Sequence, residues 1–361
     1  MGQKFNRQEV YCLFDDMKAM NYHIVFKRTG IILLILMLNN LQAQDPNFSQ
    51  FISSPLSINP ALSGSSDADW RVATVARRQW IGNVSPYSTQ TISIDGRIKN
   101  IDDQRYIGIG GMLLAENAMD GVFKTNLINL NATYHQALDE NGNGLTASLG
   151  VVSSNTRVDL AGLTFDQQLS SIGFDRALPT GETSIGRSTG FTSACAGLLY
   201  TYDTEYSFLN LGISGYRFVS SNRSLLNDAT IKTAPRYTVH ADYGATLSDN
   251  FSATFSALYL KQDGLSVTSL GTIFGFMPQP GDYTENRVRM FNAGVFYRLN
   301  DAVSPYLGYI YDNFQFGLSY DVNVASGKGA AATYKSVELS FVYKKFLPQY
   351  RKRLGRYHSP Y

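Results

Sequence analysis

The residues able to do chemistry are few and widely spaced. Four histidines occur, His23, His135, His240 and His358, and none stands in a zinc-binding spacing such as His-Glu-x-x-His. The chain has neither the Gly-x-Ser-x-Gly turn of a serine hydrolase nor a phosphate-binding loop. A lipid-cleaving enzyme would need a serine beside a histidine, and spacing alone pairs none here. The sequence therefore predicts no catalytic residue, no metal site and no cofactor, and we expect a protein that is not an enzyme.

The N-terminus has the pattern of a secretory signal peptide. Lys27 and Arg28 precede a short apolar run at residues 31–38, and small and polar residues follow. The run has about half the length that a membrane-spanning helix needs, which disfavours the alternative of a retained anchor helix.

We expect residues 1–43 to be removed by cleavage between Ala43 and Gln44. Acidic residues precede the basic pair, so translation is expected to start at Met17 or Met20. The mature chain would then keep one cysteine, Cys195, which predicts no internal disulfide and a small buried or lipid-facing side chain.

The composition excludes some partners and favours others. Lys and Arg number 31 against 29 Asp and Glu, and this balance argues against a nucleic-acid partner. Charged residues make up 17% of the chain, whereas soluble domains carry about 25%. With 23 Tyr, 21 Phe and 31 Gly, the chain suits strands that face lipid on one side and water on the other.

Segments of about ten residues alternate apolar and polar side chains, which is the period of a β-strand. Leu209, Leu211 and Ile213, for example, alternate with Asn210 and Gly212. A soluble β-sandwich would alternate in the same way. Ser, Thr, Asn and Gly dominate the polar faces and the segments are long, which favours strands that cross a membrane beside a hydrated lumen.

The sequence therefore predicts an all-β fold, a transmembrane antiparallel β-barrel at residues 70–346 with about 14 strands and an N-terminal non-strand segment. The predicted strands are approximately 70–81, 87–98, 105–115, 122–138, 144–157, 190–202, 205–219, 235–248, 250–261, 264–276, 287–299, 302–312, 314–323 and 334–346. Both chain ends would be periplasmic, with long external loops at 157–188 and 220–234. The connections 277–286 and 300–302 fit this badly, so a strand miscount is open there.

The segment 44–69 differs from the barrel in its chemistry. Pro46, Pro55 and Pro60 remove backbone donors and exclude a central strand. Such a segment would plug the lumen or cover the periplasmic mouth, with Phe48 and Phe51 as anchors. The alternative is a plain periplasmic linker.

Three motifs resemble those of a known family. They are Gln44-Asp45-Pro46-Asn47-Phe48-Ser49-Gln50-Phe51 with Ser54-Pro55-Leu56-Ser57-Ile58-Asn59-Pro60-Ala61-Leu62-Ser63-Gly64, then Arg77-Arg78-Gln79-Trp80, and Gly317-Leu318-Ser319-Tyr320-Asp321-Val322-Asn323. The mature chain resembles the PorP/SprF membrane proteins of Bacteroidota over essentially its whole length.

The resemblance implies a multi-pass bacterial outer-membrane component of the type IX secretion system, often linked with gliding motility. Such proteins are expected to support export or surface attachment of cargo such as gliding adhesins by protein–protein binding. Expected partners are the secretion machine, its cargo and outer-membrane lipid. A porin-like channel for small solutes is the alternative, and an outer-membrane enzyme is the least favoured reading. Some relatives carry a peptidoglycan-binding domain, for which the expected tail at 347–361 leaves no room.

Two segments are candidates for partner contacts. In the N-terminal segment these are Phe48, Phe51, Ile58, Asn59 and Pro60, since aromatic anchors dominate interfaces and prolines reduce the ordering cost of binding. The segment would either dock inside the barrel or bind a periplasmic component. The basic tail at 347–361 would contact a periplasmic ring or anionic lipid, or would simply be solvated.

Overall fold

A computed structural model describes residues 47–81, 86–102, 104–140, 142–160, 163–181, 188–219, 232–278, 288–324 and 335–346. All of them belong to one compact unit, Pro46–Tyr361. The expected signal peptide at 1–43, its cleavage between Ala43 and Gln44, the start at Met17 or Met20 and the tail at 347–361 lie outside the described residues.

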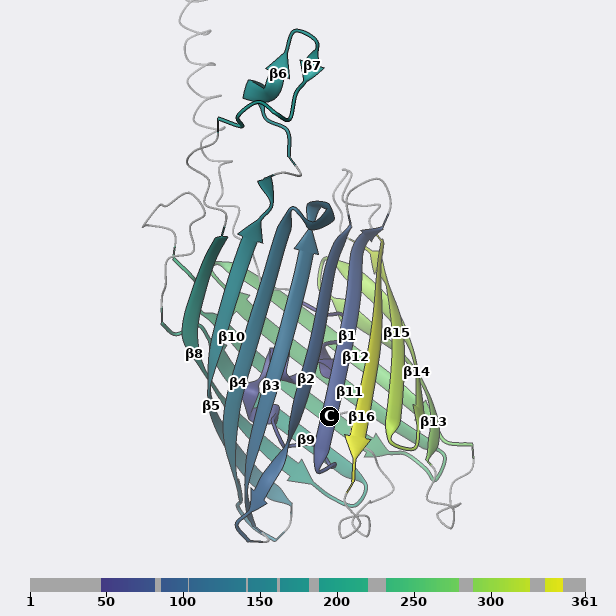
Figure 1. Ribbon diagram of the computed structural model, residues 1–361. Coiled ribbons are helices and arrows are strands. Elements are labelled where there is room, and N and C mark those ends of the chain that lie inside the picture. Colours follow the sequence, from purple (N-terminus) through teal and green to yellow (C-terminus); the bar gives the residue numbers. More distant parts are fainter. Residues whose placement is uncertain are drawn as a thin grey trace, which may run out of the picture. The chain divides into compact units, whose positions relative to one another are not determined.

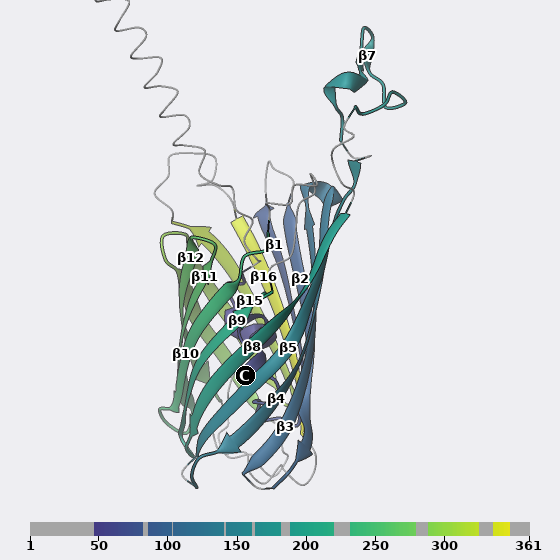
Figure 2. The same cartoon turned by 90° about the vertical axis from the view of Figure 1, so that its left-hand side faces the viewer.

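Fourteen antiparallel strands close into a barrel in which β1 pairs with β16 (Figures 1 and 2). They are β1 (Trp70–Ile81), β2 (Tyr87–Asn100), β3 (Arg105–Ala118), β4 (Phe123–Ala137), β5 (Asn143–Val158), β8 (Ser188–Asp203), β9 (Ser207–Tyr216), β10 (Arg236–Thr246), β11 (Phe251–Gln262), β12 (Leu265–Phe276), β13 (Arg289–Arg298), β14 (Ala302–Tyr311), β15 (Phe314–Asn323) and β16 (Lys335–Lys345). Closure satisfies the backbone groups of every strand and leaves no edge. The predicted fold class and strand number are confirmed.

The two faces of the wall alternate residue by residue, as predicted. Leu211 and Leu339 are exposed on the outer face, while their neighbours Asn210 and Ser340 are buried inside. Exposed large apolar side chains cover the outside of the barrel, which suits contact with lipid. A shift of one residue in register would exchange the two faces, so this pattern fixes the register.

The strand count around residues 277–302 holds, so the suspected miscount is not present. β12, β13 and β14 are all formed and pair in sequence order. Asn300, with φ of 57°, makes the tight connection between β13 and β14. A left-handed backbone is tolerated by Asn better than by most residues.

Two departures from the predicted elements occur near the long connections. β9 ends at Tyr216, before the expected residue 219, because Arg217 takes a left-handed φ of 66°. The connection after β5 contains a small unpredicted hairpin, β6 (Leu169–Ser170) with β7 (Gly173–Phe174).

The barrel has two distinct rims. We call the end that carries the long connections β5 to β8 and β9 to β10 the loop rim. The opposite end, with the short connections β2 to β3, β4 to β5 and β8 to β9, is the turn rim. In bacterial barrels the long loops are extracellular and the short turns periplasmic.

Candidate functional site: a plug inside the barrel

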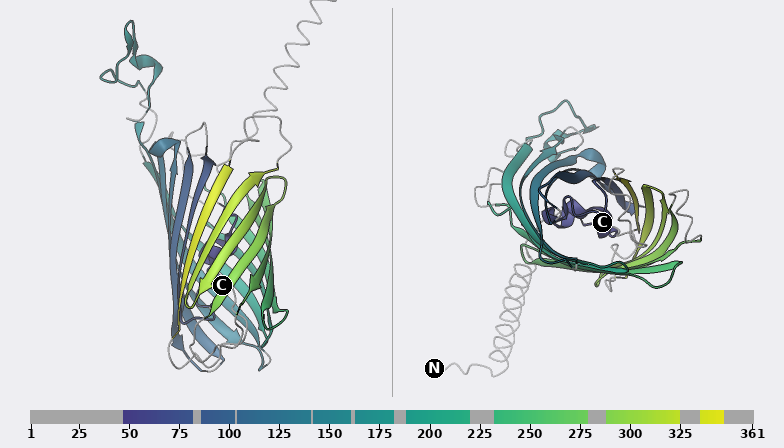
Figure 3. Two further views of the ribbon diagram at one scale, coloured as in Figure 1. Left: turned by 90° about the vertical axis from the view of Figure 1, so that its right-hand side faces the viewer. Right: turned by 90° about the horizontal axis from the view of Figure 1, so that it is seen from below.

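Residues 47–69 lie inside the ring of strands, where Figure 3 shows them in the view along the barrel. We call them the plug. The plug contains three short helices, η1 (Phe51–Ser53), α2 (Pro55–Ile58) and η2 (Pro60–Leu62). Pro55 and Pro60 each occupy the first turn of a helix, where a missing N–H and a fixed φ are favourable. No helix among the described residues is long and apolar enough to cross a membrane.

Aromatic side chains attach the beginning of the plug to the wall. The ring of Phe51 meets that of Phe296 edge to face at 5.7 Å between centroids, and Phe296 meets Tyr306 in the same way at 5.6 Å. All three side chains are almost completely buried. Such pairs contribute roughly 0.5–1.5 kcal/mol each beyond the burial of their area.

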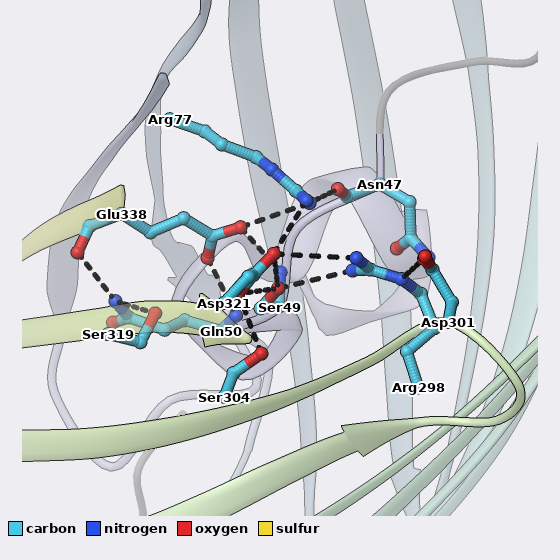
Figure 4. A network of polar contacts seen from close by, with 10 residues as sticks. All are labelled: Asn47, Ser49, Gln50, Arg77, Arg298, Asp301, Ser304, Ser319, Asp321 and Glu338. Carbon is cyan, nitrogen blue, oxygen red and sulfur yellow. Dashed lines mark hydrogen bonds and ion pairs between the residues drawn. The ribbon is translucent and has the colours of Figure 1, made fainter. Parts of the chain in front are cut away.

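A buried polar network holds the plug a few residues earlier (Figure 4). The carboxylate of Glu338 accepts hydrogen bonds from the backbone N–H groups of Ser49 at 2.7 Å and Gln50 at 2.8 Å. The Ser49 hydroxyl donates to Asp321 at 2.7 Å. The Gln50 amide donates to the Ser319 hydroxyl at 2.9 Å and accepts from Ser340 at 2.6 Å. The backbone N–H groups and the side chains of Ser49 and Gln50 are therefore matched by the wall.

Two arginines neutralise the carboxylates of this network. Arg77 is 2.8 Å from Asp321 and 3.1 Å from Glu338, and it also donates to the backbone carbonyl of Asn47. Arg298 lies 3.4 Å from Asp321 and donates to the Ser49 hydroxyl at 3.1 Å. Two positive and two negative groups thus share one buried site, as burial of charge requires. We call these four groups and Ser49 the latch.

Asn59 is the second fixed point of the plug. Its side-chain oxygen accepts from the Ala61 N–H at 2.9 Å, which caps η2. Its amide donates to the Leu198 carbonyl at 3.0 Å and meets Nε2 of His240 at 3.2 Å. Nδ1 of His240 lies 3.1 Å from Asp242, so this network assigns the proton to Nδ1 and leaves Nε2 as acceptor.

The end of the plug is bound at the turn rim. Asp95 forms a two-point ion pair with Arg71, at 2.9 and 3.0 Å, and accepts from the Gly64 N–H at 2.9 Å. Arg71 also donates to the Leu62 carbonyl at 3.0 Å. Two-point pairs fix geometry as well as charge.

Glycines in the wall make room for the plug. A Cβ atom on Gly197 would stand 2.0 Å from the side-chain oxygen of Asn59, and one on Gly212 would stand 2.7 Å from its nitrogen. Only glycine permits such a close approach at these two inward positions.

The plug runs down the lumen from the loop-rim half to the turn rim. The backbone carbonyl of Asn47 accepts a hydrogen bond from Arg77, which lies in the second half of β1. The backbone N–H of Asp69 donates to the carbonyl of Lys345, which is the last residue of β16. The start of β1 and the end of β16 thus lie at the same rim, the turn rim. The first described residue of the plug lies nearer to the other rim.

The five residues proposed for partner contacts, Phe48, Phe51, Ile58, Asn59 and Pro60, are all buried inside the barrel. They hold the plug inside the barrel and are not exposed to a partner. Among the described residues, no group of three or more His, Cys, Asp or Glu side chains is placed to hold a metal ion.

Several residues that hold the plug were not predicted. Asp95 and Glu338 are acidic side chains at inward positions of their strands. Arg77 and Asp321 stand in the family motifs but had no assigned role. A charged residue on the inner face of a predicted strand is the signal that would have pointed to a buried partner.

The chain is similar to several solved structures. The Pseudomonas putida toluene transporter TodX is 9% identical, covering 86% of this chain and all of its own, with a TM-score of 0.49. The Ralstonia pickettii toluene transporter TbuX is 12% identical over 82% of this chain and 94% of its own, with a TM-score of 0.46. A Pseudomonas aeruginosa FadL homologue is 11% identical over 76% and 89%, with a TM-score of 0.45. No curated protein matches.

One family matches most of the chain. Its description is type IX secretion system membrane protein PorP/SprF, and the match covers residues 40–343, which include the plug and nearly the whole barrel. The chain therefore belongs to the PorP/SprF family of type IX secretion system membrane proteins, and it is a multi-pass β-barrel protein of the bacterial outer membrane.

Proposed function

We propose that this protein acts in type IX secretion as a closed barrel that supports export or surface attachment of cargo, such as adhesins, by binding other proteins. The observation that carries the proposal is the plug, which lies inside the lumen and is bound to the wall near Ser49, Asn59 and Gly64. Family membership supports a role in secretion rather than in catalysis.

The contacts of the plug favour a binding role over a solute channel. Its hydrogen bonds to charged groups of the wall are buried at both ends, through Glu338 near Ser49 and through Asp95 near Gly64. Hydrogen bonds to charged groups contribute about 1.5–3 kcal/mol each, so release of the plug for each passing solute would be expensive. A partner protein would instead find its contacts at the two rims.

In this proposal Phe48, Phe51, Ile58, Asn59 and Pro60 serve partner binding by holding the plug in place. Their side chains are buried inside the barrel, so they fix the position of the plug. The described barrel wall is then a membrane anchor, and the rims are the surfaces offered to partners.

Co-purification from native outer membranes tests this function. The tagged protein, extracted in mild detergent, should bring down secretion-machine subunits or a secreted cargo protein, and after purification it should give no steady conductance in planar bilayers. A tagged porin from the same membranes is the control for both readouts. A pull-down that contains neither secretion-machine subunits nor cargo, together with steady conductance, would refute the proposal and favour the channel.

A further inference from the structure

Four basic side chains stand on the outer wall of the barrel next to the loop rim. They are Arg78 of β1, Lys124 of β4, Arg157 of β5 and Lys335 of β16, and all four are exposed. Each of these side chains occupies an outward position in its strand. In β1, for example, Arg77 is buried inside the barrel and the next residue, Arg78, is exposed. Within the part of the chain that the structure describes, none of the four takes part in an ion pair.

Strand register places these side chains in one row. β16, β1, β2, β3, β4 and β5 are consecutive neighbours in the wall and face the viewer in Figure 1. Arg78 stands opposite Ser88, Ser88 opposite Asn117, and Asn117 opposite Lys124. All four side chains lie within three residues of the loop-rim end of their strands, so the row follows this rim.

Within the row, Lys124 and Arg157 stand directly opposite each other on β4 and β5. Like charges in this position destabilise a sheet unless an anion lies between them or beside them. The carboxylates of Asp120 and Asp159 are close to this row in the chain. Four cations and two carboxylates together keep a net positive charge. The row therefore attracts an anion from outside the chain.

A hollow of about 780 Å³ connects the row to the apolar wall. Its polar side is lined by Arg78, Lys124, Asn117 and Gln90, with Asp120 at its margin. Its apolar side is lined by residues of β1 and β16, namely Ala76, Ile81, Val337 and Leu339. The hollow is thus amphipathic and suits a ligand with an anionic head and a hydrocarbon tail.

The height of the row matches the boundary of the hydrocarbon layer. Further from the loop rim, the same strands turn Ile92, Leu113, Leu130 and Leu149 outward, and these side chains are 49%, 52%, 62% and 74% exposed. Large exposed apolar side chains mark the part of a barrel wall that meets acyl chains. Cations just beyond this belt stand where lipid head groups lie.

We propose that this face of the barrel binds a phosphorylated glycolipid of the outer leaflet. A phosphate of the lipid is held by Arg78 and Lys124, and one acyl chain enters the apolar side of the hollow. Arginine and lysine are the usual phosphate ligands, and the apolar half of the hollow selects a lipid over a soluble anion. The site gives the barrel one preferred lipid contact, on the sector formed by β16, β1, β2, β3, β4 and β5.

The opposite wall provides a matched control. There, among the described strands, Lys261 of β11 is an exposed outward cation at the loop rim, and Arg289 of β13 is one at the turn rim. The double variant Lys261→Gln/Arg289→Gln removes the same charge as Arg78→Gln/Lys124→Gln but leaves the hollow intact. The conservative double variant Arg78→Lys/Lys124→Arg keeps both charges in place.

The test titrates detergent-solubilised protein with purified outer-membrane glycolipid, before and after enzymatic removal of its phosphates, and counts bound lipid by native mass spectrometry. Wild type, the Lys261/Arg289 variant and the conservative variant should bind the phosphorylated lipid alike. The Arg78→Gln/Lys124→Gln variant should bind it about tenfold more weakly or worse, because two charge-assisted contacts are lost.

Heat-modifiable migration confirms that each variant is a folded barrel before the titration. Equal weakening in both glutamine variants would mean a general belt of cations and would overturn the site. Equal binding of the dephosphorylated lipid would show that the phosphate contributes nothing to binding, and it would overturn the proposed phosphate site. Full displacement of the lipid by inorganic phosphate would make the site one for soluble anions and would also overturn it.

Discussion

A chain that lacks residues 47–64 is expected to insert as a barrel, to conduct ions and to lose export or display of its cargo. The fourteen strands satisfy their backbone groups with one another, so the wall does not need the plug to stay closed. Without the plug, Glu338, Asp321, Arg77 and Arg298 would line a water-filled lumen. Conductance in planar bilayers and surface display of cargo in a chromosomal deletion strain measure the two effects.

A point variant tests the same prediction with the full chain present. Gly197→Val would place a side chain against Asn59, where even a Cβ atom would be 2.0 Å from the amide oxygen, and it should unseat the plug. Gly111→Val is the control, since Gly111 is not inward and its nearest neighbour is a flexible leucine side chain at 3.3 Å. Unchanged display in a conducting Gly197→Val protein would show that secretion does not depend on the plug.

Asp321→Leu is expected to destabilise the protein by about 3–5 kcal/mol, because it leaves Arg77 and Arg298 buried with one carboxylate fewer. Asp301→Leu is the matched control. It removes another carboxylate paired with Arg298, but the Asp301 side chain is 48% exposed, and exposed pairs contribute about 0–1 kcal/mol.

Denaturant unfolding of both variants in detergent, followed by heat-modifiable migration, compares the two free energies of unfolding. The larger loss should belong to Asp321→Leu, and this variant should also be the more sensitive of the two to proteolysis within the plug. Equal losses for the two variants would mean that the latch contributes no more than a surface pair.

The strands could be predicted from the sequence because the information for them is local. Alternation and turn residues fixed β1 at Trp70–Ile81 and β15 at Phe314–Asn323 to the residue. Alternation also placed Leu211 outside and Asn210 inside. The early end of β9 was missed because Arg217 adopts a left-handed backbone, which its residue type does not announce.

The contacts of the plug could not be predicted, because they join residues far apart in the chain. Ser49 and Glu338 are separated by 289 positions, and nothing local in either segment identifies the other as its partner. Glu338 lies on the inner face of its strand, and such polar faces were expected to meet a hydrated lumen. His240 and its partner Asn59 are likewise 181 positions apart.

A disulfide between the plug and the wall tests the central claim most directly. The hydroxyl oxygens of Ser54 in the plug and Thr91 in β2 are 3.3 Å apart and buried. In a chain that carries Ser54→Cys, Thr91→Cys and Cys195→Ala, mild oxidation of native outer membranes should join the two new thiols almost completely. Thiols that remain free after oxidation and react rapidly with a membrane-impermeant maleimide would show that the plug does not occupy the lumen.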